Sequence, residues 1–123
     1  MKPKRLAEMS TDELAERFAE IGIAQYNALD NDEYRKFNKL YGQMDDVDHE
    51  LRARAEEARF ALTRLYAHPN AQVRLQAAKW SFALAPEAAR KVIQAIADSK
   101  WPPQYLEAGM TLFNLDNGTF VRD

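Results

Sequence analysis

The residues best placed to do chemistry lie in an acidic stretch near the middle of the chain, where Asp45 precedes His49 by four positions. In a helix this spacing puts both side chains on one face, so both could reach a single cation. Asn38 and Arg52 fall on the same polar stripe. A zinc site needs three or four ligands, but the chain has only two histidines and no cysteine. We therefore expect a solvated helix face, with no metal and no cofactor.

Nucleophilic catalysis finds little support in the sequence. Ser10 is placed as a helix cap, Ser81 lies within a helix and Ser99 lies in a turn, and none of them sits in a Gly-x-Ser-x-Gly elbow. The four glycines are scattered, so no glycine-rich loop is available to cradle a phosphate. We expect no catalytic residue, and therefore not an enzyme.

Asp48 differs from the other acids because it falls inside the apolar arc of its helix, beside Tyr41, Met44 and Leu51. A buried carboxylate needs a partner, because an unpaired buried charge is very costly. We predict that Arg74 is this partner, and that the Asp48–Arg74 ion pair docks the N-terminal helices onto the second half of the chain.

The aromatic residues of the second half are candidates for a binding surface. Trp80 has a core phase and is expected to be buried, whereas Trp101 precedes a proline pair in a loop. We expect Trp101 to pack as a core or lid residue, with an exposed binding tryptophan as the alternative. The candidate binding residues are Asn38, Tyr41, Asp45, His49, Arg52, Trp101 and Tyr105.

These side chains must be positioned by helices. The 123 residues include only four glycines and five prolines, and no block rich in valine, isoleucine and threonine suggests a strand. We expect one domain over 1–123, with a flexible N-terminus over 1–9 and two N-terminal helices within 10–54. Ser10 begins the first helix in a capping box with Glu13, and the acidic run 30–33 begins the second, which ends near 54. A third helix ends before Pro69, Asn70 caps the fourth, Pro86 opens the fifth, and the last reaches about 115.

An internal repeat organises the second half. An offset of 31 residues aligns Leu62 with Ile93, Leu65 with Ile96, Leu75 with Leu106, Ala77 with Ala108, Ala78 with Gly109 and Leu84 with Leu115. A period of this size is typical of stacked helix pairs, each of which completes its core on its neighbour.

The stretch 68–78, with its Pro-Asn turn, its Val73-Arg74 pair and its small residues at 77 and 78, resembles the second helix of a HEAT-type repeat. The resemblance implies one HEAT-like unit over 56–84 and a degenerate unit over 87–115, where Tyr105 replaces the arginine. The chain also resembles a family of small bacterial helical proteins of unknown function, through the residues 38–41 and 44–48 and through Leu51. Together these imply an all-α fold, a short alpha-alpha superhelix of the HEAT/armadillo type with about six helices, and they carry over no activity.

Charge and composition narrow the function. The 17 basic and 19 acidic residues give a net charge of -2, and no apolar run is long enough to span a membrane. The chain has no cysteine and so forms no disulfide, and together with the lack of a membrane-spanning run this favours the cytoplasm. We expect a protein-binding adaptor or inhibitor. One form of inhibitor is an immunity-type protein that neutralises a toxin, and this form is suggested only by analogy at the level of the fold. Its protein partner is unidentified, and a homodimer through uncapped end helices is possible.

The alternative is a nucleic-acid-associated helical-repeat protein. It would use the arginines 52, 54, 59 and 64, with or without a weak enzymatic activity built on Asp45, Asp48 and His49. The nearly balanced charge makes nucleic acid the less favoured partner.

Overall fold

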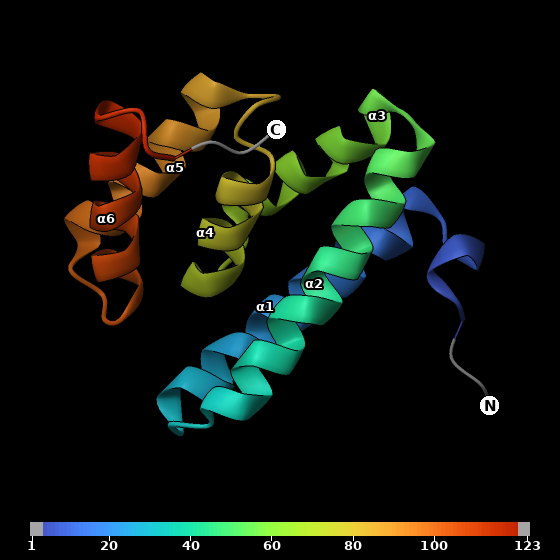
Figure 1. Ribbon diagram of the computed structural model, residues 1–123, viewed down its shortest axis with the longest axis horizontal. Coiled ribbons are helices and arrows are strands. Elements are labelled where there is room, and N and C mark those ends of the chain that lie inside the picture. Colours follow the sequence, from blue (N-terminus) through green and yellow to red (C-terminus); the bar gives the residue numbers. More distant parts are fainter. Residues whose placement is uncertain (1–3, 121–123) are drawn as a thin grey trace. The chain divides into compact units, whose positions relative to one another are not determined.

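The computed structural model describes residues 4–120 and is helical throughout, with no strand in this range. Its elements are η1 (Leu6–Glu8), α1 (Thr11–Asp30), α2 (Tyr34–Arg54), α3 (Glu56–Arg59), η2 (Phe60–Ala67), α4 (Ala71–Trp80), α5 (Pro86–Ser99) and α6 (Gln104–Asp116), where η denotes a 3-10 helix (Figure 1). The predicted all-α fold with about six helices is confirmed. The chain forms two compact units, an N-terminal unit (Met1–Ala61) and a C-terminal unit (Leu62–Asp123). Their boundary falls inside the HEAT-like unit predicted for 56–84, and that repeat assignment is not confirmed.

The N-terminal unit is built on the pair α1 and α2, which lie side by side in Figure 1. The predicted capping box begins α1: the Glu13 amide donates to the Ser10 hydroxyl and the Ser10 amide donates to the Glu13 carboxylate, both at 3.0 Å. The apolar residues Leu14 and Phe18 of α1, and Met44 and Leu51 of α2, are fully buried. Apolar side chains at helical spacing thus supply the core of this unit.

The start of α2 differs from the prediction. The acidic run 30–33 was expected to cap it, but the residue before the helix is Glu33, whose side chain makes no capping hydrogen bond. Asp32 instead adopts a φ of 56°, in the left-handed region that asparagine and aspartate enter more easily than most residues. The acidic run therefore makes a tight turn between the helices.

The segment before α1 was expected to be flexible over 1–9, of which residues 1–3 lie outside the described range. The described part is anchored by Arg54, at the end of α2, whose Nη2 donates to the carbonyl oxygens of Leu6 at 3.1 Å and Met9 at 2.6 Å. Arg54 Nε also donates to Glu50 Oε2 at 3.0 Å. One arginine therefore holds the η1 turn against the end of α2.

The predicted third helix is α-helical only over Glu56–Arg59 and continues as the 3-10 helix η2 over Phe60–Ala67. A 3-10 run of this length is uncommon, because its hydrogen-bond geometry is poorer than that of an α-helix. Phe60, Thr63 and Tyr66 are weaker helix formers than the alanines and leucines that suggested a regular helix.

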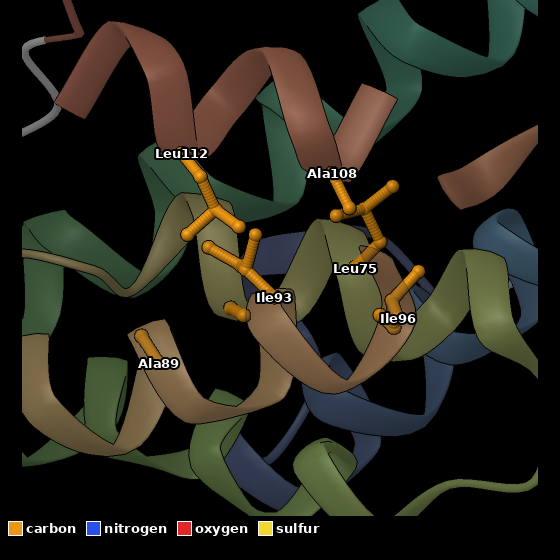
Figure 2. Close-up of a cluster of buried hydrophobic side chains, with 7 residues drawn as sticks. Leu75, Ala89, Ile93, Ile96, Ala108 and Leu112 are labelled. Carbon is orange, nitrogen blue, oxygen red and sulfur yellow. The ribbon is translucent and has the colours of Figure 1, made fainter. Parts of the chain in front are cut away.

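The C-terminal unit packs α4, α5 and α6 around one apolar cluster (Figure 2). Its buried members are Leu75, Ala78, Ala89, Ile93, Ile96, Ala108 and Leu112. Local signals fix the ends of the helices as predicted: the Asn70 side chain accepts from the amides of Gln72 and Val73, and Pro86 lies in the first turn of α5. Trp80 is buried, as its phase predicted.

A polar network joins α4 to α6 beside this cluster. Gln104 Nε2 donates to Gln72 Oε1 at 3.0 Å. Glu107 Oε2 accepts from Gln76 Nε2 at 2.9 Å and from Lys79 Nζ at 3.1 Å. Because buried amides need partners, these bonds fix the register of α6 against α4.

Candidate functional site

The outer face of α6 carries a row of large apolar side chains that the C-terminal unit leaves uncovered. Leu106, Met110 and Phe113 are 57%, 67% and 68% exposed. Their spacing of four and three residues places them in one line along the helix. A single exposed apolar residue is ordinary, whereas a contiguous apolar patch is typical of an interaction site. We call Leu106, Met110 and Phe113 the α6 row.

A shallow groove of about 360 Å³ lies beside this row, between α5 and α6. Its lining residues are Ala97, Lys100, Tyr105, Leu106, Gly109, Met110 and Phe113. Among the described residues of that lining, only Lys100 is charged, and its Nζ lies 5.7 Å from the centre of the Tyr105 ring, within range of a cation–π contact. Apart from its chain neighbours and the backbone of its own helix, no described heavy atom lies within 4 Å of the position a Cβ on Gly109 would take, so another backbone can approach closely there.

The 31-residue offset explains why this face is apolar. It aligns Leu106, Gly109 and Phe113 of α6 with Leu75 and Ala78 of α4 and with Phe82 just after it. Leu75 and Ala78 are fully buried in the cluster that α5 and α6 complete, and Phe82 packs against that cluster. No further helix follows α6 within the described residues. Two members of the α6 row, Leu106 and Phe113, therefore lie at positions whose counterparts pack in or against this cluster, whereas Met110 aligns with the half-buried Lys79.

Two predicted binding residues, Trp101 and Tyr105, lie at this end of the unit. Trp101 is 54% exposed, so the expectation that it packs as a core or lid residue is wrong and the exposed alternative holds. Tyr105 is half-buried and lines the groove. The structure thus brings Tyr105 together with the α6 row, while a binding role for either aromatic stays a prediction.

The other five predicted residues, Asn38, Tyr41, Asp45, His49 and Arg52, lie on α2 in the N-terminal unit. Asn38 and Tyr41 are exposed. His49 Nδ1 lies 2.9 Å from the Asp45 carbonyl oxygen and 3.3 Å from Asp45 Oδ2, so the two residues contact each other within one turn. Among the described residues, no group of three or more His, Cys, Asp or Glu side chains could hold a metal ion.

The predicted Asp48–Arg74 ion pair would join the two units and stays a prediction, while each of the two residues has local partners. Asp48 is buried, as predicted, but its Oδ2 accepts from Arg52 Nε at 2.6 Å, one helical turn away. Arg74 Nη1 donates to the carbonyl oxygens of His68 at 2.7 Å and Pro69 at 3.0 Å, in the turn before its own helix. Each arginine meets an acceptor that its local backbone already places within reach.

A second hollow, of about 310 Å³, lies in the N-terminal unit and is lined by Leu6, Arg17, Ile21, Gln43, Asp46 and Val47. Its lining mixes charged and apolar side chains. One of the charged residues, Arg17, forms an ion pair with Glu20, with 4.0 Å between Nη1 and Oε2. It lacks the continuous apolar row of α6.

Leu106, Met110 and Phe113 are not among the candidate binding residues chosen from the sequence, because the repeat aligns Leu106 with Leu75 and so places it in the core. One signal was present. Helix α6 is apolar on two sides, with Ala108 and Leu112 buried on one and the α6 row on the other. A helix that is apolar on two sides is more often covered on both than on one.

Comparisons with known proteins bear on the fold and the family. A family model described as a domain of unknown function (DUF2019) matches residues 12–116, from the second residue of α1 to the last residue of α6. The crystal structure of the protein RPA1889 from Rhodopseudomonas palustris CGA009 is similar, at 44% identity with a TM-score of 0.92, over 98% of this chain and 100% of that one. No curated protein matches the chain. Within the described range, no helix combines the length and apolar character needed to cross a membrane.

Proposed function

The chain belongs to the DUF2019 family, described as a domain of unknown function, and we propose that it is a protein-interaction module. In this proposal, the α6 row binds a helical segment of a protein partner. The adaptor or inhibitor role expected from the sequence would be exercised through this contact.

The observation that carries the proposal is the exposure of the α6 row beside the groove. Methionine and aromatic residues are enriched where proteins contact one another. An apolar row at positions i, i+4 and i+7 next to a groove is the pattern by which helices recognise one another. Met110 and Phe113 are the expected anchors, because they are the most exposed members of the row.

The alternative partner, nucleic acid, receives less support. Of the four arginines expected to bind a phosphate backbone, Arg52 pairs with Asp48, and Arg54 pairs with Glu50 and two backbone carbonyls. Arginines held in this way are poorly placed to neutralise phosphates.

Site-specific photo-crosslinking tests the proposed surface even though the partner is unidentified. A photoreactive phenylalanine analogue would replace Phe113, and the same analogue at Ala88 would serve as the control, because Ala88 is exposed on α5 and does not line the groove. We expect a discrete protein adduct from position 113 in cells of the source organism, and none from position 88. A Met110→Glu substitution should abolish the adduct, because it places a charge in the centre of the row.

The proposal would be refuted if position 113 gave no protein adduct, or the same adducts as position 88. Adducts to nucleic acid, together with salt-sensitive retention on DNA, would support the alternative partner.

A further inference from the structure

We propose that the occupant of the α6 row is the same row of a second copy of this chain. The two α6 helices would pack antiparallel about a two-fold axis that passes between Gly109 and Met110. This inference rests on the proposed function, since it names the partner of the same surface.

The order of residues along α6 is self-complementary in this arrangement. When two identical helices cross antiparallel at a point between 109 and 110, Leu106 of one copy lies opposite Phe113 of the other. The long Met110 side chain lies opposite Gly109, where the described residues leave space beside the backbone. All three members of the row are then covered in both copies by one contact. A symmetric contact of this kind closes on itself, whereas a head-to-tail contact would leave one face open.

The charges at the two ends of α6 favour the antiparallel orientation. Lys100 lies just before the helix, and Asp116 is its last residue. The exposed Asp116 carboxylate accepts a hydrogen bond from Arg90 Nη2 at 2.8 Å. An antiparallel contact brings the Lys100 end of one copy to the Asp116 end of the other. A parallel contact would place Lys100 against Lys100. The helix dipoles have the same preference, because the positive N-terminus of each α6 meets the negative C-terminus of the other.

The size of the row sets the expected strength. Three large side chains and a shallow groove per copy form a contact at the small end of the range for specific interfaces. We therefore expect a dissociation constant on the order of micromolar or weaker, with monomer and dimer in exchange. The mass measured by sedimentation should rise with concentration from 14.1 kDa toward twice that value.

The absence of cysteine from the chain makes a direct geometric test possible. Gly109→Cys would place one thiol per copy beside the two-fold axis, where the Cα atoms could come within the roughly 4.4–6.8 Å that a disulfide requires. Ala88→Cys is the matched control, exposed in the same unit but outside the groove. We expect Gly109→Cys to form a covalent dimer in an oxidising buffer much faster than Ala88→Cys. Adding Met110→Glu to Gly109→Cys should remove this difference.

Sedimentation of the cysteine-free chain completes the test. We expect a concentration-dependent dimer for the wild type and for Ala88→Glu, and a monomer for Met110→Glu with an unchanged circular dichroism spectrum. A wild type that remains monomeric at high concentration, or a dimer that persists in Met110→Glu, would overturn the inference. If the wild type is monomeric while position 113 still crosslinks to a different protein, the second copy is excluded but the proposed function stands.

Discussion

A pair of leucines offers the sharpest test of the C-terminal unit. Leu75 and Leu106 are 31 positions apart and align in the internal repeat, yet Leu75 is fully buried and Leu106 is 57% exposed. Replacing each with alanine removes the same atoms from two helices of similar length. We expect Leu75→Ala to destabilise the unit strongly and Leu106→Ala only weakly.

The burial of each side chain sets the size of the difference. Leu75 belongs to one buried cluster with Ile93, Ile96 and Leu112 from two other helices, so its loss leaves a cavity that the surrounding helices only partly fill. Fully buried leucines cost about 2.7–5.0 kcal/mol when replaced by alanine, and we expect about 3 kcal/mol here. Leu106 keeps less than half of its surface covered. Since full burial of a leucine side chain stabilises by about 1.5–3 kcal/mol, its truncation should cost less than about 1 kcal/mol.

Urea unfolding followed by tryptophan fluorescence measures this difference in the C-terminal unit, because both tryptophans, Trp80 and Trp101, lie there. The protein concentration should be low enough to prevent self-association, so that the monomer alone is compared. A gap of about 2 kcal/mol or more in the free energy of unfolding is expected. Equal losses for the two variants would refute the assignment of one leucine to the core and the other to an open face.

Three further predictions concern polar contacts. Arg54→Met should release the N-terminal turn at a cost of about 1–3 kcal/mol, because it removes the charged donor to two carbonyl oxygens. Limited trypsin digestion should then cleave after Arg5 faster than in the wild type, and an unchanged cleavage rate would contradict this prediction. Glu107→Leu should cost about 1–3 kcal/mol in urea unfolding, because the buried Gln76 amide loses its acceptor; Glu107→Gln, which retains an acceptor oxygen, should cost less. Burial raises the pKa of the Tyr66 hydroxyl above the ordinary tyrosine value of about 10. The contribution of this group to stability is therefore complete below that ordinary value and is lost as pH rises through the raised pKa. The urea midpoint of the wild type should be lower above this pH range than below it, and the difference should be smaller for Tyr66→Phe.

The local structure of this protein could be predicted from the sequence because its causes lie within a few residues of one another. The Ser10 capping box, the Asn70 cap and Pro86 at the start of α5 each depend on side chains that reach only the next turn. The full length of α2 could be predicted because its apolar residues keep one phase. At the acidic run 30–33 local reasoning failed, because the same residues suit both a cap and a tight turn.

The partners of charged side chains could not be predicted in the same way. Asp48 was correctly placed among apolar residues, and this required a cation, but the sequence offered several arginines. Arg52 Nε lies 2.6 Å from Asp48 Oδ2, because one helical turn already places it within reach without any distant segment having to dock. Arg54 shows the opposite case, since its contacts with Leu6 and Met9 join residues more than forty positions apart.

The order of the amino acids is enough to predict that this chain is all-helical, where most of its helices begin and end, and that its second half repeats a pattern of apolar residues. Which of those apolar residues are covered depends on how the helices pack. Periodicity places Leu75 and Leu106 at equivalent positions, but burial depends on whether another helix pair follows. Helices α5 and α6 follow α4, and no described helix follows α6. For that physical reason the same pattern forms the core in one helix and an exposed apolar face in the other.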